Sequence, residues 1–421
     1  MYLVEDKGGA IALMLVSLFF LGTWPAIMNF LERKGRLPQH TYLDYCITNY
    51  LAAILIAFTL GQIGSSTPET PNFLTQLKQD NGPSVAFAMA GGVVLCLGNL
   101  SLQYALAFVG LSVAEVISCS LTVVAGTTMN YFLDARINRA EILFPGVACF
   151  LVAVFLGSAL HASNMADNNA KLEKAQIGDS HKDNFTDGSS NLDNLESAAK
   201  TIGNRNSFDI DKKLDGDKLT SSEGKPIGGT AEFLKQLEKR RAIKDTASST
   251  ILGLFIIFFA GGCFSLFSPA FNVATNDQWH TLKPGVPHLV VYTAFFYFST
   301  SFFVLAVFLN IFFLYKPILG LPKSSFSKYA ADWKGRPWAL LAGLLCGLGN
   351  GLQFMGGQAA GYAAADAVQA MPLVSTVWGV LIFREYYRSS RKTYVLLASM
   401  LLMFVVAVAV LMASSGKRKT H

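Results

Sequence analysis

Ten stretches of about 20 mostly apolar residues dominate this chain, and a stretch of that length and composition is what a helix needs to cross a bilayer. They occupy residues 10–31, 44–62, 84–107, 111–133, 141–160, 250–273, 288–314, 337–358, 363–383 and 393–414. Short loops join them, except for one long segment between the fifth and the sixth. We therefore expect an all-α integral membrane protein with ten transmembrane helices.

Charged residues are scarce and unevenly placed. They make up 15% of the 421 residues, against about 25% in soluble domains, which excludes a soluble globular enzyme. The 88 residues from His161 to Ser248 hold 14 Lys/Arg and 15 Asp/Glu. We expect three parts: a first membrane half (1–160), a cytoplasmic, mostly disordered loop (161–248) and a second membrane half (249–421), with residues 230–244 as a short amphipathic helix.

The basic residues predict the orientation of the chain. With the amino terminus outside, 26 of the 34 Lys and Arg face the cytoplasm and 8 face the outside. When the long loop is left out of the count, 12 face the cytoplasm and 8 face the outside. The net charge of +6 is explained by these loop residues rather than by a nucleic-acid partner. The six cysteines form no C-x-x-C pair, so we expect no zinc site or other metal centre.

The two halves of the chain repeat one another. Leu97-Gly98-Asn99 recurs as Leu348-Gly349-Asn350, an offset of 251 residues, and without a gap the same offset aligns Glu115 with Asp366. Each half holds five spans, an odd number, so the second half must enter the membrane in the opposite orientation. Two inverted five-helix repeats around a central site are typical of alternating-access transporters.

Two carboxylates lie inside the predicted helices, Glu115 in the fourth span and Asp366 in the ninth, whereas Asp44 and Glu141 lie at span edges near water. A charged group within the membrane is costly and usually faces a functional cavity, which favours proton coupling for both. A capping role is the alternative for both. Ser112-Val113-Ala114-Glu115 fits a capping box, and an Asp one turn into a helix is stabilised by the positive end of the helix dipole.

Neutral polar and aromatic residues in the same spans are the second candidate group. Amides pair with adjacent C=O and N–H groups of a planar substrate, and aromatic rings offer it a stacking face; amides that only join neighbouring helices are the alternative. Pro25, Pro269 and Pro372 either break their helices toward a cavity or only kink them. The candidates for substrate binding are Asn99, Gln103, Asn350, Gln353, Trp24, Phe354 and Trp378.

Three blocks of the sequence resemble the plant ureide permease family: the opening MYLVEDKGGAIALMLVSLFFLGTWPAIMNFLERKGRLPQHTYLDY, the CLGNLSLQYALAFVGLSVAEV block, and GTAEFLKQLEKRRAIK before the sixth span. The resemblance covers essentially the whole chain. It implies a ten-span member of the drug/metabolite transporter superfamily with a large cytosolic central loop. It also implies proton-coupled uptake of allantoin and other oxo derivatives of nitrogen heterocycles, such as uracil, xanthine and uric acid, at the plasma membrane.

Some members of that family are credited with a nucleotide-binding motif before the sixth span. Here Ala247-Ser248-Ser249 stands where G-K-[ST] should be, so both the lysine that reaches the phosphates and its glycine are missing. We expect no ATP site and no other cofactor, because a proton gradient suffices for secondary transport.

Other functions remain as alternatives. A facilitator or exchanger of another small polar metabolite would share the architecture, although phosphate-bearing cargo finds no Lys or Arg within a span. A membrane receptor would not need the repeat. An enzyme would need a catalytic cluster, and the spans hold no H-E-x-x-H or G-x-S-x-G motif, so we expect a protein that is not an enzyme.

Overall fold

The computed structural model describes residues 4, 6–109, 111–189, 230, 232, 250–318 and 321–416, and over these residues it contains helices and no strand. In chain order the helical elements are α1 (Lys7–Arg33), α2 (Pro38–Phe58), α3 (Phe73–Gln76), α4 (Gly82–Val109), α5 (Leu111–Leu121), η1 (Thr122–Gly126), α6 (Thr127–Leu133), α7 (Ala140–Ser189), α9 (Thr250–Asn276), α10 (Val291–Tyr315), α11 (Phe326–Ala331), α12 (Arg336–Ala360), α13 (Tyr362–Ala365), η2 (Asp366–Gln369), α14 (Met371–Phe383) and α15 (Arg391–Ala413).

The prediction of ten spans is confirmed, because the described residues contain ten helical segments long and apolar enough to cross a membrane. Eight of them are single helices, whereas the fourth span joins α5, η1 and α6 and the ninth joins α13, η2 and α14. Large apolar side chains cover the outside of the bundle; Phe155 and Phe255 are each 71% exposed. A surface of this kind suits the hydrocarbon of a bilayer and not water.

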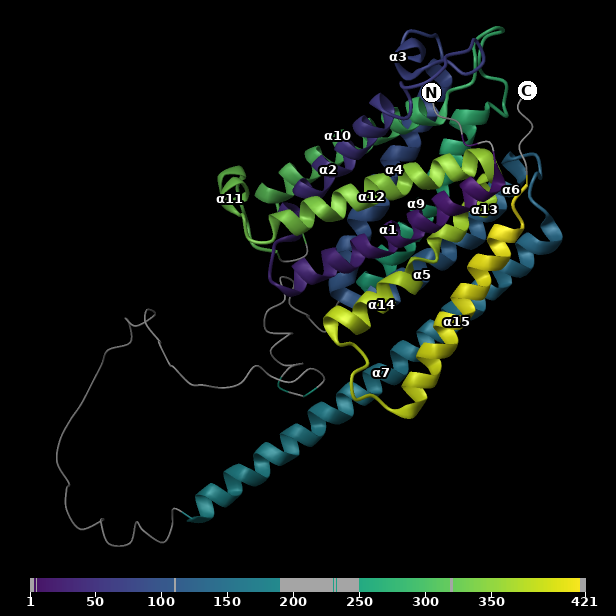
Figure 1. Cartoon of the computed structure of the whole chain (residues 1–421). Coiled ribbons are helices and arrows are strands. Elements are labelled where there is room, and N and C mark those ends of the chain that lie inside the picture. Colours follow the sequence, from purple (N-terminus) through teal and green to yellow (C-terminus); the bar gives the residue numbers. More distant parts are fainter. Residues whose placement is uncertain are drawn as a thin grey trace.

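The spans pack in a regular pattern. α1 runs along α12, and α4 runs along α9. α2 packs on α12, α10 packs on α4, and α2 and α10 also pack on each other. The two broken spans complete the interior: α5 and η1 pack on α9, and α14 packs on α1. α7 and α15 form a pair at the edge of the bundle, and α7 extends far beyond it (Figure 1).

Two glycines set the closest helix approaches. A Cβ added to Gly343 of α12 would lie 2.0 Å from the carbonyl oxygen of Tyr45 in α2, and one added to Gly92 of α4 would lie 1.9 Å from that of Phe298 in α10. Any larger residue would push these helices apart, as at other small-residue contacts between membrane helices.

The bundle has two distinct ends. At the N-terminal end, where α1 begins and α15 stops, the Lys7 ammonium donates to the Ser415 carbonyl at 3.0 Å, and the backbone N–H of Gly416 donates to the carbonyl of Ala360 at the end of α12. The start of α1 and the end of α15 lie side by side there (Figure 1). The opposite side, toward which α7 extends, is called the insert end below.

Of three local expectations, one was open between two alternatives, one is corrected and one is not tested. α1 and α9 continue through Pro25 and Pro269 without a break, because a proline costs one backbone hydrogen bond and the helix on either side stays packed. α7 does not end at residue 160 but runs to Ser189, and its polar extension is held by contacts such as Asp167 Oδ2 accepting from the Thr393 hydroxyl at 2.7 Å. The expected disorder of the remaining insert and the helix at 230–244 lie outside the described residues, apart from Thr230 and Glu232.

Candidate transport site

The ninth span is interrupted in the membrane, and the interruption presents Asp366. α12 ends at Ala360, and the next residue, Gly361, has a φ of 99°, which is open to glycine and strained for other residues. The backbone N–H of Tyr362 then donates to Asp134 Oδ2 at 2.7 Å. A 3₁₀ turn begins at Asp366, and the regular helix resumes only at Met371, with Pro372 in its first turn.

The Asp366 carboxylate is 1% exposed and has few partners. Its Oδ2 accepts a hydrogen bond from Asn130 Nδ2 at 2.9 Å, and a Cβ on Gly126, the last residue of the π-helical turn η1, would lie 3.7 Å from it. The irregular turn of the fourth span therefore lies against the irregular turn of the ninth. Single π-turns inside α-helices occur often at functional sites.

Part of this carboxylate is left unsatisfied. The Thr127 hydroxyl lies beside it, yet neither Thr127 Oγ1 nor Asp366 Oδ1 makes a hydrogen bond of ordinary geometry to any residue that the structure describes. An ionised carboxylate buried without partners is unfavourable. A proton on Asp366, or a hydrogen-bonding group of a ligand, would satisfy the free oxygen.

A row of amides connects Asp366 with the N-terminal end, and we call it the amide chain. Asn130 Oδ1 accepts from Asn272 Nδ2 at 3.2 Å, Asn272 Oδ1 accepts from Asn276 Nδ2 at 2.7 Å, and Asn276 Oδ1 accepts from Gln358 Nε2 at 3.4 Å. Asn276 ends α9, and Gln358 is two residues from the end of α12. The amide chain therefore forms a polar route between the buried Asp366 carboxylate and the N-terminal end of the bundle.

A second polar group, the tyrosine cluster, surrounds Tyr45 of α2. The hydroxyl of Tyr45 accepts from Asn99 Nδ2 at 2.9 Å and donates to Cys346 Sγ at 2.9 Å, while Asn350 Nδ2 donates to the Cys346 carbonyl at 3.0 Å. The ring of Trp24 lies 5.4 Å from that of Tyr45. The structure thus brings together three of the predicted site residues, Asn99, Asn350 and Trp24.

Gln353 is the most available of the predicted amides. It is fully buried, and neither its Nε2 nor its Oε1 has a hydrogen-bond partner among the described residues. It lies seven residues after Cys346 and three after Asn350, on the same face of α12. Gln103 donates to the Pro38 carbonyl at 3.0 Å, and its Oε1 is also unpartnered.

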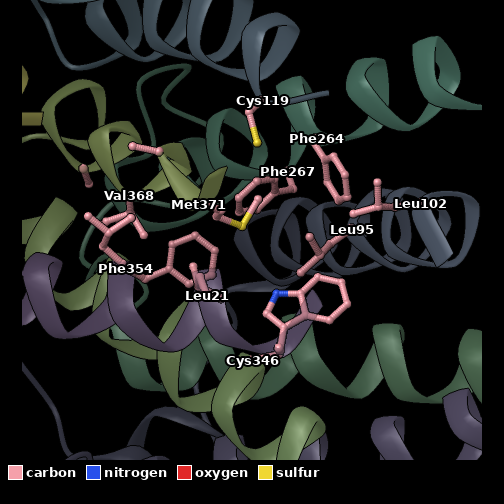
Figure 2. Packing of buried hydrophobic residues seen from close by; sticks show 14 of the residues in the cluster. Leu21, Leu95, Leu102, Cys119, Phe264, Phe267, Cys346, Phe354, Val368 and Met371 are labelled. Atoms are coloured by element: carbon pink, nitrogen blue, oxygen red, sulfur yellow. The ribbon is translucent and has the colours of Figure 1, made fainter. Parts of the chain in front are cut away.

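An apolar layer lies along α12 between the two polar groups. Phe354, one turn from both Asn350 and Gln358, stacks on Phe271 with ring centres 3.6 Å apart and an angle of 1°. Figure 2 shows Leu21, Phe267, Val368 and Met371 pointing into the same interior as Phe354 from different elements. Phe271 occupies one face of Phe354, and Phe267, Phe295 and Phe298 make T-shaped contacts with it, so a substrate could stack on the face held by Phe271 only after a rearrangement.

Two predicted residues lie apart from this interior. Trp378 donates its indole N–H to the Thr23 hydroxyl at 2.9 Å, and its ring lies 6.3 Å from that of Phe19, which is 49% exposed. It therefore lies on the outer seam between α1 and α14. Glu115 belongs to α5, and its side chain is outside the described residues.

The expectation that Asp44 sits near water is wrong. It is 2% exposed, and its Oδ2 accepts from Arg36 Nη2 at 2.6 Å and from Arg336 Nε at 3.2 Å, while its Oδ1 accepts from the hydroxyl of Tyr329 at 2.7 Å. Loops around α11 and the start of α12 cover this end of α2, which the length of an apolar run does not reveal.

The partners of Asp366 and Asn99 were missed as site residues. Asn130 carried a signal, as an amide within the fourth span, and so did Ser268 and Asn272, which lie four residues apart on one face of α9. Asn130 Nδ2 also contacts the Ser268 hydroxyl at 2.8 Å. Tyr45 carried no signal, because a tyrosine near a span edge usually marks only the membrane interface.

Comparison with known proteins adds an independent observation. A family model described as ureide permease matches residues 41–414. "Ureide permease 1" and "Ureide permease 2" of Arabidopsis thaliana are 66% and 65% identical over 419 residues, with both chains covered completely. "Probable ureide permease A3" of Vigna unguiculata is 62% identical over 395 residues, which cover 94% of this chain and all of that protein.

Proposed function

Because the chain belongs to the ureide permease family, we propose that it is a proton-coupled permease that imports allantoin and other oxo derivatives of nitrogen heterocycles, such as uracil, xanthine and uric acid. The observation that carries the transport function is the full-length similarity to proteins named ureide permeases. The finer proposals, on protons and on individual substrates, rest on the chemistry of the interior.

Proton coupling is assigned to Asp366, with Glu115 as its counterpart in the first half. Asp366 is a buried carboxylate with one unsatisfied oxygen, and the amide chain gives it a polar connection to one end of the bundle. Binding a proton removes the cost of burying its charge, and release requires access to water. Alternating access would therefore load and unload the proton together with the substrate.

Substrate recognition is assigned to the amides. Ureides and oxidised heterocycles present adjacent C=O and N–H groups, which match the paired donor and acceptor of a carboxamide. Gln353 has both groups free in the interior. Asn99, Asn350 and Gln103 would bind the substrate after partial exchange of their present partners, and Trp24 and Phe354 would line its path; Trp378 stays a proposal from the sequence.

The inverted repeat is part of the proposal, and paired contacts support it. Gly92 and Gly343 are 251 residues apart, the offset of the sequence repeat, and each is the closest approach of its helix to a neighbour, α10 and α2. At the same offset, a Cβ on Gly98 would meet Phe264 of α9 and one on Gly349 would meet Leu21 of α1. The two glycines of the third span thus contact spans seven and six. The two glycines at the same offset in the eighth span contact spans two and one, which are the corresponding spans of the first half.

The proposed setting is the plasma membrane, with the N-terminal end outside and the insert end in the cytoplasm. The partners are then the heterocyclic substrate, protons and the lipid bilayer, without ATP, a metal or a nucleic acid. In this orientation the amide chain opens toward the outside, which suits a carrier that takes up protons and substrate from there.

Uptake of radiolabelled allantoin and uracil at external pH 5 and pH 8, with and without a protonophore, tests the proposal. Saturable uptake that is stronger at pH 5 and collapses with the protonophore is expected. Uptake indifferent to both would indicate a facilitator, and uptake of neither compound would contradict the substrates. Binding of a substrate without any uptake would favour a receptor.

A further inference from the structure

A cavity of about 260 Å³ lies at the insert end, between the connection from α1 to α2 and the turn that leads into α12. Three cations line it, Lys34, Arg36 and Lys334, together with His40 and Asp332. It is separate from the interior described above, because its walls are the ends of helices rather than their middles.

Arg36 is a buried cation with unused hydrogen-bond donors. Its side chain is 3% exposed, and its Nη2 donates to Asp44 Oδ2 at 2.6 Å. Within the part of the chain that the structure describes, Nη1 has no hydrogen-bond partner, and Nε lies 3.5 Å from Asp332 Oδ2 without making a hydrogen bond. A guanidinium with free donors in two directions matches an anion that carries several oxygens.

The carboxylates near the cavity are already engaged. Asp44 is shared between Arg36 and Arg336, and Asp332 accepts from His40 Nδ1 at 2.8 Å. Burial opposes ionisation of Asp332, but this hydrogen bond and the charge of Arg36 outweigh it and hold the pKa of Asp332 below its usual value. Among the described residues that line the cavity, three cations, Lys34, Arg36 and Lys334, face one carboxylate, Asp332, which leaves an excess of two positive charges.

Exposed aromatic residues lie in and beside the cavity. Trp338 lines it, is 49% exposed and lies 5.9 Å from the ring of Phe30. Trp333, in the turn before α12, is 70% exposed. Exposed tryptophans at the ends of transmembrane helices are typical of the headgroup level of a bilayer.

We propose that this cavity binds the phosphate group of an anionic membrane lipid, with Arg36, Lys34 and Lys334 around the phosphate and Phe30 and Trp338 against the glycerol and upper acyl chain. Basic pockets between transmembrane helices bind such headgroups in other proteins. Free phosphate shares the headgroup chemistry, so the test separates the two sources. The site is independent of the transported substrate, and its failure would leave the uptake function untouched.

The test is direct binding to the purified full-length protein in detergent. The probes are a dioctanoyl phosphatidylinositol 4-phosphate, dioctanoyl phosphatidylcholine as the zwitterionic control without net charge, and inorganic phosphate. The variant Lys34→Gln/Lys334→Gln removes two cations from the cavity and leaves buried Arg36 in place. Lys323→Gln/Lys328→Gln is the matched control, because it removes the same charge from exposed positions at the same end and outside the cavity.

We expect the phosphoinositide to bind and to raise the melting temperature, and phosphatidylcholine to do neither. The cavity variant should lose roughly 25-fold in affinity, since each of its two lysines contributes about a factor of five. Free phosphate binding as tightly, with the same loss, would support the cavity and identify a soluble anion as its ligand. Equal losses in both double variants, or no binding of either phosphate probe, would overturn the proposal.

Discussion

At the scale of single residues, the proposed mechanism rests on one carboxylate. The sequence was sufficient to single out Asp366, because an acidic residue inside an apolar span is costly and therefore conspicuous. Its environment could not be predicted, since the surrounding groups come from two other spans: Gly126 and Asn130 from the fourth and Ser268 from α9. Contacts between distant segments leave no local pattern in the sequence.

Asn130 should be needed for transport. Replacing it with Leu keeps its size but removes the amide that holds Asp366 Oδ2 and links it to Asn272. Losing a hydrogen bond to a buried carboxylate costs about 1–3 kcal/mol, so substrate uptake should fall at least about fivefold at equal expression. Thr128→Val is the control, because the Thr128 hydroxyl bonds only to the Val124 carbonyl of the previous turn. Uptake by Asn130→Leu at the level of the control would contradict the assignment.

Gly361 should be intolerant of a side chain. Its φ is 99°, and a Cβ there would lie 2.4 Å from the Asn138 side chain. We expect Gly361→Ala to destabilise the protein by about 1–3 kcal/mol and to lower its melting temperature in detergent. Gly262→Ala in α9 is the matched control, because its Cβ would meet no atom within 4 Å. Equal melting temperatures for the two variants would show that the break after α12 does not require glycine.

At the scale of elements, the apolar runs were sufficient to predict all ten spans but not the breaks within two of them. Pro372 indicated the break within the ninth span, where the regular helix restarts at Met371. The π-turn η1 in the fourth span had no comparable signal, because its sequence TVVAG is compatible with an ordinary helix. Pro25 and Pro269 gave the same signal as Pro372 without a break, so packing on neighbouring helices decides the outcome.

The connection between α9 and α10 should show acid-sensitive stability. Asp277 Oδ1 accepts from the Thr281 backbone N–H at 2.8 Å and from its hydroxyl at 2.7 Å, and Oδ2 accepts from the Leu282 N–H at 3.1 Å. Burial opposes ionisation, but these hydrogen bonds outweigh it and lower the pKa of Asp277. Its contribution to stability is therefore fully present above about pH 4, the pKa of an Asp in the unfolded chain, and is lost as the pH falls through the lower folded value.

Asp277→Ala should accordingly melt at a lower temperature than the parent protein at pH 7, and the difference should shrink below pH 4. Asp80→Ala provides the comparison, because Asp80 pairs with Lys283 at an exposed position, where ion pairs contribute little. A difference between parent and Asp277→Ala that stays constant from pH 7 to pH 3 would show that the carboxylate charge is not involved.

At the scale of the whole molecule, the account requires a particular orientation in the membrane. The count of Lys and Arg predicts that the loop with Lys283 is outside and the loop with Lys323 is in the cytoplasm. Both side chains are exposed. A membrane-impermeant maleimide should therefore label Lys283→Cys on intact cells and Lys323→Cys only after permeabilisation, with the parent protein as the background control. The reverse pattern would invert the proposed direction of the amide chain.

The arrangement of the two halves was only partly accessible from the sequence. The 251-residue offset predicts which spans correspond, and the paired contacts of Gly92 with Gly343 and of Gly98 with Gly349 are consistent with it. The sequence could not predict that Asn99 and Asn350 approach one cluster around Tyr45, because spans that are apolar on all faces carry little information on which face turns inward.

The central claim, that Asp366 couples protons to substrate movement, can be measured directly in proteoliposomes that contain a pH-sensitive dye. Addition of allantoin or uracil outside should acidify the lumen when the parent protein is present. In Asp366→Asn, which cannot carry the proton, acidification should be lost while exchange of labelled substrate across the membrane persists. Substrate-driven acidification by Asp366→Asn at the rate of the parent protein would contradict the account.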